Sequence, residues 1–231
     1  MIAWELLATG PIPGGGELRL MRRGDEYSIR LGANELMNSR RGGSEEALAT
    51  LACAGIRDRA QARVLIGGLG MGFTLRAELA ALGPAARVEV AELVPAVARW
   101  AQTEMAAIFA GSLQDPRVRL ELCDVGRLIG AGGARYDAIL LDVDNGPDGL
   151  TRAANDWLYD ARGLAAARAA LRPGGVLAVW SSGPDPRFTR RLRDAGFATQ
   201  EVGARANGAR GGARHVIWLA SRPAEATRGK G

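Results

Sequence analysis

Short apolar runs alternate with longer segments of helical periodicity through the middle of the chain. The apolar runs predict strands at residues 63–66, 87–91, 118–123, 137–141 and 176–180. Between them the pattern predicts helices at 71–82, 94–109, 125–130 and 155–171. Such alternation is typical of an α/β fold, a doubly wound Rossmann-like parallel sheet with helices on both faces.

The two ends of the chain follow other patterns. Residues 17–31 alternate around a turn at Gly24, which predicts a β-hairpin, and 34–38 add a short strand. Near the C-terminus, strands at 198–202 and 215–220 are expected to pair antiparallel. We therefore divide the chain into an N-terminal β-hairpin region (1–43), a Rossmann-like catalytic domain (44–222) and a frayed tail (223–231).

Composition narrows the possible classes of protein. The 231 residues contain no apolar run of membrane-spanning length, and the N-terminus does not resemble a secretory signal. Cys53 and Cys123 lie in apolar contexts, which indicates reduced thiols and a cytoplasmic protein. The single histidine, His215, makes a histidine-based metal centre improbable, and we expect no metal. A net charge of +5 is modest for a nucleic-acid-binding protein, so a nucleic-acid partner is not expected.

A glycine cluster after the first predicted strand carries the clearest chemical signal. Gly68, Gly70 and Gly72 allow a tight turn and a close approach to a bound nucleotide-type cofactor. Twenty residues further on, Glu92 ends the second strand, where a carboxylate can accept hydrogen bonds from a ribose diol. Phe73 replaces the third glycine of the dinucleotide fingerprint, which disfavours NAD. The spacing suits S-adenosylmethionine, which carries no phosphate.

Two further strands are also followed by carboxylates. Asp124 follows the third strand, where it is expected to accept from the adenine amine, to cap the next helix, or both. Asp142 follows the fourth strand and is the candidate for a base or an amine anchor, with Asp144 and Asn145 as helpers. Ligands of open α/β sheets bind beyond these strand ends, so the acids are expected to surround one site.

Several segments resemble the spermidine synthases and their relatives among the class I S-adenosylmethionine-dependent methyltransferases. They are 67–76, 90–93, 115–118, 123–124, 136–142, 158–159 and 171–175. The resemblance implies a cofactor site formed by Gly68, Gly70, Met71, Gly72, Glu92, Asp124 and Asp142, with Asp142, Asp144 and Asn145 as catalytic residues. It also implies a small-molecule acceptor and a possible homodimer formed through the N-terminal part.

The chain departs from the aminopropyltransferase pattern at three places. Met71 stands where these enzymes have an Asp that holds the amine of decarboxylated S-adenosylmethionine. The D-S-S-D pattern becomes Asp142-Val143-Asp144-Asn145, and the Tyr-His-Glu triplet becomes Ser44-Glu45-Glu46, which keeps only the Glu. These departures favour methyl transfer from intact S-adenosylmethionine to a small molecule.

Two alternatives to methyl transfer remain open. The first is an aminopropyltransferase of polyamine synthesis that uses the decarboxylated cofactor. The second is a noncatalytic or RNA-associated module, in which the glycine-rich loop with Arg205, Arg210 and Arg214 grips phosphate. A solvated hairpin loop explains the same residues.

Overall fold

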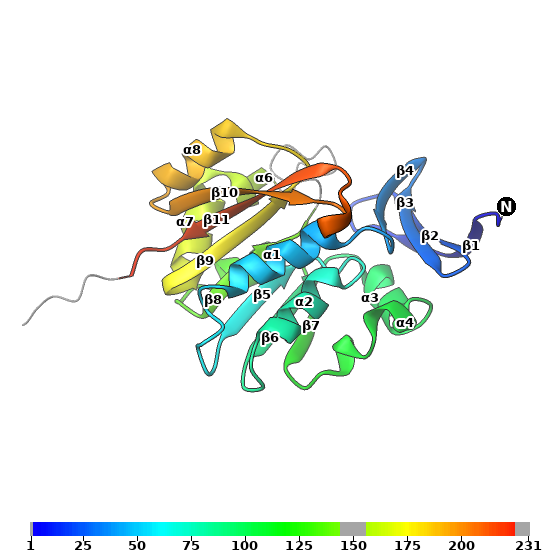
Figure 1. Ribbon diagram of the computed structural model, residues 1–231, viewed down its shortest axis with the longest axis horizontal. Coiled ribbons are helices and arrows are strands. Elements are labelled where there is room, and N and C mark those ends of the chain that lie inside the picture. The colour runs from blue at the N-terminus through cyan, green and yellow to red at the C-terminus, as the bar shows by residue number, and fades with distance from the viewer. Residues whose placement is uncertain (1, 144–155, 225–231) are drawn as a thin grey trace, which may run out of the picture.

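The computed structural model describes residues 2–143 and 156–224, which form two β-sheets and the helices that cover them. In Figure 1 the smaller sheet lies at one end of the molecule and the larger sheet forms its centre. The predicted α/β class, with a Rossmann-like sheet after a small N-terminal β region, is confirmed. Asp144 and Asn145 lie outside the described residues, as does most of the expected tail.

The smaller sheet is antiparallel and has the order β1-β2-β3-β4. The predicted hairpin is β2 (Glu17–Arg23) and β3 (Glu26–Leu31), and the short third strand is β4 (Asn34–Asn38). The structure adds β1 (Glu5–Pro11), for which the sequence pattern predicts no strand. A register shift between Leu6 and Ala8 interrupts the alternation of β1, so its sequence lacks a regular strand pattern.

The larger sheet has seven strands in the order β10-β11-β9-β8-β5-β6-β7. The five predicted core strands run parallel, and β11 pairs antiparallel with β10, as expected. Strand β11 also pairs antiparallel with β9. Their bounds are β5 (Arg63–Gly67), β6 (Arg87–Glu92), β7 (Val118–Leu122), β8 (Tyr136–Leu141), β9 (Leu171–Ser181), β10 (Ala198–Arg205) and β11 (Arg214–Ser221). The strand order reverses at β5, whose neighbours are β6 and β8.

Alternate residues of the strands face two separate cores. In β5, Val64 and Ile66 contribute to the core beneath α1, α2 and α3, whereas Leu65 contributes to the core beneath α5, α7 and α8. The helices are α1 (Gly43–Cys53), α2 (Phe73–Ala81), α3 (Pro95–Gln102), α4 (Ala106–Phe109), α5 (Val125–Gly130), α6 (Asp156–Tyr159), α7 (Ala161–Ala170) and α8 (Pro186–Asp194). The sheet is therefore the middle of three layers, which fixes where its strand ends emerge.

Two predicted helices are divided in the structure. The segment predicted as one helix at 94–109 forms α3 and α4, and residues 156–170 of the segment predicted at 155–171 form α6 and α7. Strand β9 also begins at Leu171, earlier than predicted, because residues 171–175 continue the strand past a register shift. No helix among residues 2–143 and 156–224 is long and apolar enough to cross a membrane. The division of the chain into domains stays a prediction.

A buried acid fixes the edge of the sheet opposite the candidate site. Asp137 is 1% exposed and lies at the start of β8. Its carboxylate accepts hydrogen bonds from the Arg63 amide at 2.7 Å, from the Arg172 guanidinium at 2.8 Å and from Arg59. One side chain thus ties together the beginnings of β5, β8 and β9 and the segment after α1.

We expect Asp137→Asn to lower the free energy of unfolding by about 2–3 kcal/mol, since the buried hydrogen-bond network loses its negative charge and one of its two acceptor oxygens. Urea denaturation followed by circular dichroism would measure the change. Asp58→Asn, at an exposed position nearby in the chain, is the control and should change stability by less than about 0.5 kcal/mol. Equal stability of the two variants would contradict this role for Asp137.

Candidate functional site

The glycine loop between β5 and α2 turns through three left-handed glycines. Gly68, Gly70 and Gly72 have φ values of 90°, 51° and 74°. A Cβ on Gly68 would lie 2.4 Å from the carbonyl oxygen of Asp142, and one on Gly72 would lie 2.6 Å from the Phe109 ring. Gly68 therefore allows the loop to pass the end of β8, whereas Gly72 allows α2 to begin against the core.

Glu92 connects this loop to the end of β6. The side chain is 7% exposed, and its carboxylate oxygens accept hydrogen bonds from the Leu69 amide at 3.0 Å and the Val94 amide at 2.7 Å. Burial raises the pKa of Glu92, while the backbone donors oppose that shift. The Leu69 and Val94 amides occupy two of the about four acceptor positions of this carboxylate, and the amides of Leu93 and Gly70 also favour its charged form.

Asp124 follows β7 and performs the capping role that was one of its two expected functions. Its Oδ1 accepts from the Gly126 amide at 2.7 Å, at the start of α5. The residue is half-buried and also lines the cavity described below. The geometry therefore leaves both expected functions compatible.

Asp142 follows β8 and approaches the start of α2. Its Oδ2 accepts from the Thr74 hydroxyl at 2.7 Å, and its amide donates to the Gly67 carbonyl at 3.0 Å. Burial raises the pKa of Asp142 to about 6, and the Thr74 hydrogen bond counteracts this effect. The carboxylate is therefore poised to exchange a proton near neutral pH.

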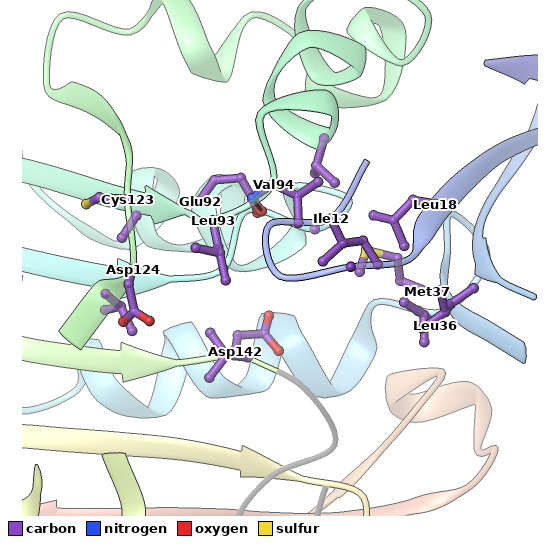
Figure 2. Close-up of a pocket in the computed structure, with 18 residues that line it drawn as sticks. Ile12, Leu18, Leu36, Met37, Glu92, Leu93, Val94, Cys123, Asp124 and Asp142 are labelled. Atoms are coloured by element: carbon purple, nitrogen blue, oxygen red, sulfur yellow. Dashed lines mark hydrogen bonds between the residues drawn. The ribbon is translucent and has the colours of Figure 1, made fainter. Parts of the chain in front are cut away.

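A cavity of about 200 Å³ opens beyond these strand ends. Figure 2 shows Glu92, Asp124 and Asp142 at the ends of strands of the larger sheet, with Ile12, Leu18, Leu36 and Met37 of the N-terminal region across from them. Apolar side chains contribute most of its wall, among them Leu93, Val94, Val97 and Val125. An apolar cleft with a few converging acids is typical of a small-molecule site.

A second cavity of about 140 Å³ shares Leu36, Met37, Gly70 and Asp142 with the first. Its other lining residues are Asn38, Glu45, Leu69, Met71, Phe73 and Trp180. Because the two cavities have four residues in common, they lie next to each other and meet at the glycine loop and Asp142. Together they can receive a ligand longer than either cavity.

The structure brings together most of the predicted site residues. Gly68, Gly70, Glu92, Asp124 and Asp142 line the first cavity, and Met71 lines the second. Gly72 lines neither cavity, and its described role is to allow α2 to pack on Phe109. The predicted catalytic helpers Asp144 and Asn145 lie outside the described residues.

Sequence reasoning missed Glu45 and the apolar wall supplied by the N-terminal sheet. The family triplet retains its Glu at position 46, but Glu46 is exposed and the adjacent Glu45 lines the second cavity. Glu45 and Glu46 both lie in the first turn of α1, where neighbouring residues point about 100° apart. The sequence alone does not show which of the two faces the cavity.

Tyr159 and the glycine-rich loop pack against other parts of the structure and line neither cavity. Tyr159 is 4% exposed and its ring packs edge-on against Phe188. The glycine-rich loop that had suggested RNA binding docks on the start of α1, where the Gly43 amide donates to the Ala206 carbonyl at 2.9 Å. Within the described part of the chain, no three His, Cys, Asp or Glu side chains are grouped to hold a metal.

Sequence comparison finds polyamine aminopropyltransferases. The chain is 31% identical over 191 residues to the polyamine aminopropyltransferase of Mycobacterium tuberculosis strain H37Rv, and 37% identical over 136 residues to that of Corynebacterium efficiens. These matches cover 79% and 58% of this chain but 35% and 25% of the relatives, so the chain spans about a third or less of their length. No family model matches the chain.

Comparison of structures finds the same fold in spermidine synthases. Spermidine synthase from Thermotoga maritima matches 95% of this chain and 74% of its own, with a TM-score of 0.72 and 18% identity. A spermidine synthase in complex with the transition-state analogue AdoDATO also has a TM-score of 0.72 and covers 95% of this chain and 73% of its own. At this identity the likeness is one of fold.

These findings correct one sequence-based expectation. Methyl transfer from intact S-adenosylmethionine was the favoured reaction, and that expectation is wrong. The relatives are named polyamine aminopropyltransferases and the structural neighbours are spermidine synthases, which supports the aminopropyl alternative instead. The methyltransferase interpretation depended on three departures from the aminopropyltransferase pattern, at Met71, at Asp144-Asn145 and at Ser44-Glu45.

The surroundings of two loop glycines predict different effects of an added methyl group. We expect Gly68→Ala to lower the free energy of unfolding by more than about 2 kcal/mol, since its Cβ collides with the backbone of Asp142. In Gly70→Ala the Cβ would meet only the Met37 sulfur at 3.6 Å, so we expect a loss of about 1 kcal/mol for the left-handed conformation. Urea denaturation of both variants would measure the decrease in the free energy of unfolding. A larger decrease for Gly70→Ala than for Gly68→Ala would contradict the prediction.

The two acids of the second cavity predict a pH-dependent stability. Burial and the charge of Asp142 raise the pKa of Glu45 to about 7. Its ordinary pKa in the unfolded chain is about 4.3, so ionisation opposes folding increasingly as the pH rises from about 4 to about 7. Glu45→Gln removes this effect. We expect the unfolding free energy of the variant, relative to wild type, to be higher at pH 8 than at pH 5.

Urea denaturation at the two pH values would measure this difference. Contributions from other buried acids, such as Glu78, cancel because both proteins contain them. Glu46→Gln on the exposed side of α1 is the control, with a difference from wild type that stays nearly constant. A pH-independent difference for Glu45→Gln would contradict the prediction.

Proposed function

We propose that this spermidine synthase-like chain is a transferase that moves an aminopropyl group from decarboxylated S-adenosylmethionine to an amine acceptor of the polyamine class. The observation that carries the proposal is the position of Asp142, a half-buried carboxylate where the two cavities meet. Sequence similarity to polyamine aminopropyltransferases over 79% of the chain supports the reaction class.

The first cavity suits the adenosyl part of the donor. Glu92 is anchored by two backbone amides and would accept hydrogen bonds from the ribose hydroxyls, which also favour its ionised form. Asp124 would accept from the exocyclic amine of adenine. Leu93 and Val125 line the same cavity and offer apolar surface for the flat base.

The second cavity would hold the aminopropyl group and the approaching acceptor. The neutral acceptor nitrogen attacks the methylene carbon bonded to the sulfonium, a new C–N bond forms, and the C–S bond breaks with its electron pair passing to sulfur. Methylthioadenosine leaves as a neutral thioether, and the acceptor nitrogen loses a proton. The sulfonium is already an activated leaving group, so the protein's task is alignment and proton removal.

Asp142 is the proposed acceptor of that proton. The Thr74 hydroxyl fixes the orientation of the carboxylate, and its pKa of about 6 leaves it mostly ionised at pH 7–8. An ionised carboxylate also attracts a protonated amine before the reaction. Asp144 and Asn145 are proposed to assist it, and a cytoplasmic location and a homodimer likewise stay predictions.

The reaction can be tested directly with decarboxylated S-adenosylmethionine and a set of diamines, by chromatography of methylthioadenosine and the aminopropylated product. We expect transfer by wild type and a loss of at least roughly 100-fold in kcat/KM for Asp142→Asn, which can no longer accept the proton. Asp58→Asn is the control and should retain wild-type activity. No product with any diamine, from protein that is folded, would overturn the proposal.

A further inference from the structure

The second cavity contains a carboxylate that no motif assigns. Glu45 lies in the first turn of α1 and lines this cavity together with Met71, Asp142 and Trp180. The glycine loop contributes Leu69, Gly70 and Met71 to the same cavity. A group that extends from the first cavity past Gly70 and Asp142 therefore arrives between the loop and Glu45.

The glycine loop itself supplies no charge at this place. Met71 stands where the resemblance to the aminopropyltransferases implies an acid, and it lines the second cavity with 3% of its surface exposed. Its thioether is a weak acceptor and cannot form a charge-assisted hydrogen bond. Any cation held in the second cavity must find its counter-charge elsewhere.

Glu45 is held in place by a chain of hydrogen bonds. The buried Ser44 hydroxyl donates to Glu45 Oε2 at 2.7 Å, and His215 Nδ1 lies 2.9 Å from the same hydroxyl oxygen. Since the hydroxyl has one proton and gives it to Glu45, His215 must donate its Nδ1–H to Ser44. The imidazole ring also packs against Trp180, another residue of the cavity wall, with ring centres 4.7 Å apart.

Within residues 2–143 and 156–224, the acids of the second cavity have no cationic side chain as a partner. Asp142 and Glu45 repel each other, which contributes to the raised pKa of Glu45. Among the described residues, no ion pair involves either carboxylate. Arg76 instead donates to the carbonyl oxygens of Met71 and Ile108. A cationic ligand between the two acids would relieve this repulsion.

We propose that Glu45, acting with Asp142, binds the terminal ammonium of the aminopropyl group and thereby replaces the acid that the glycine loop lacks at Met71. This inference rests on the proposed function and names the residue that selects its donor. A carboxylate on the same carbon, as in intact S-adenosylmethionine, would meet two acids here and be repelled. Glu45 is thus a specificity-determining residue.

Calorimetry with two ligands separates this contact from the rest of the site. The decarboxylated form of S-adenosylhomocysteine carries the aminopropyl ammonium on a neutral thioether, whereas methylthioadenosine has the same nucleoside and thioether without the ammonium. We expect Glu45→Gln to weaken binding of the first by roughly 10- to 100-fold, because a charge-assisted contact is lost, and to leave binding of the second within about 2-fold. Glu46→Gln, on the same helix turn but exposed, should change neither affinity.

A second variant tests whether the acid can be moved back to the loop. The double variant Glu45→Gln/Met71→Asp places the carboxylate in the glycine loop. We expect this variant to recover at least about half of the binding free energy that Glu45→Gln loses for the ammonium ligand. Thermal unfolding would show whether the buried Asp is tolerated. If that variant does not fold, the comparison of Glu45→Gln with Glu46→Gln decides the matter.

The outcomes separate this inference from the proposed function. Wild-type protein that binds neither nucleoside would overturn both. Wild-type binding of both ligands, with Glu45→Gln unchanged or equally weakened for each, would overturn only the role of Glu45. Unchanged affinity for the ammonium ligand with a raised KM for the diamine would assign Glu45 to the acceptor and likewise overturn it.

Discussion

The candidate site depends on the hydrogen bonds that the Glu92 carboxylate makes to two segments of backbone. By accepting from Leu69 and Val94, Glu92 joins the glycine loop to the start of α3, and the first cavity opens between these segments. The buried acid is costly to ionise without partners, and backbone amides, those of Val94 and Leu69 foremost, are partners that the chain provides. A ribose diol would add further donors to the same group, so the interaction that shapes the loop also prepares it for a nucleoside.

The N-terminal sheet has a function beyond its own stability. Ile12, Leu18, Leu31, Leu36 and Met37 face the strand ends of the larger sheet and supply the second wall of the first cavity. Without that wall the strand ends would open to solvent, and the acids would act in water rather than in an apolar cleft. The two sheets, separate in their hydrogen bonding, are thus joined by the site that they enclose.

The mistaken preference for methyl transfer shows how a motif can mislead when its positions are considered singly. Met71 cannot hold an amine, and that fact correctly describes the loop. However, α1 brings Glu45 into the same cavity as Met71, and the two residues are 26 positions apart in the chain. In the arrangement we propose, the negative charge that pairs with the donor's ammonium lies in the same cavity. It is supplied by Glu45 of α1 and not by a residue of the glycine loop.

The sequence by itself determined the elements whose signals are local. Apolar runs and helical periodicity predicted the parallel strands, the glycine turn and the antiparallel pair at the end of the large sheet, because side-chain period reports which faces are buried. The sequence also showed that Glu92, Asp124 and Asp142 lie where three strands end. In a parallel sheet these strand ends lie at the same edge, so the acids were expected to be neighbours. Only the tertiary structure showed β1, whose irregular register hides its strand character, and which of Glu45 and Glu46 enters the site. That choice is set by the rotation of α1 about its axis, which depends on packing against α2 and the large sheet rather than on the local sequence.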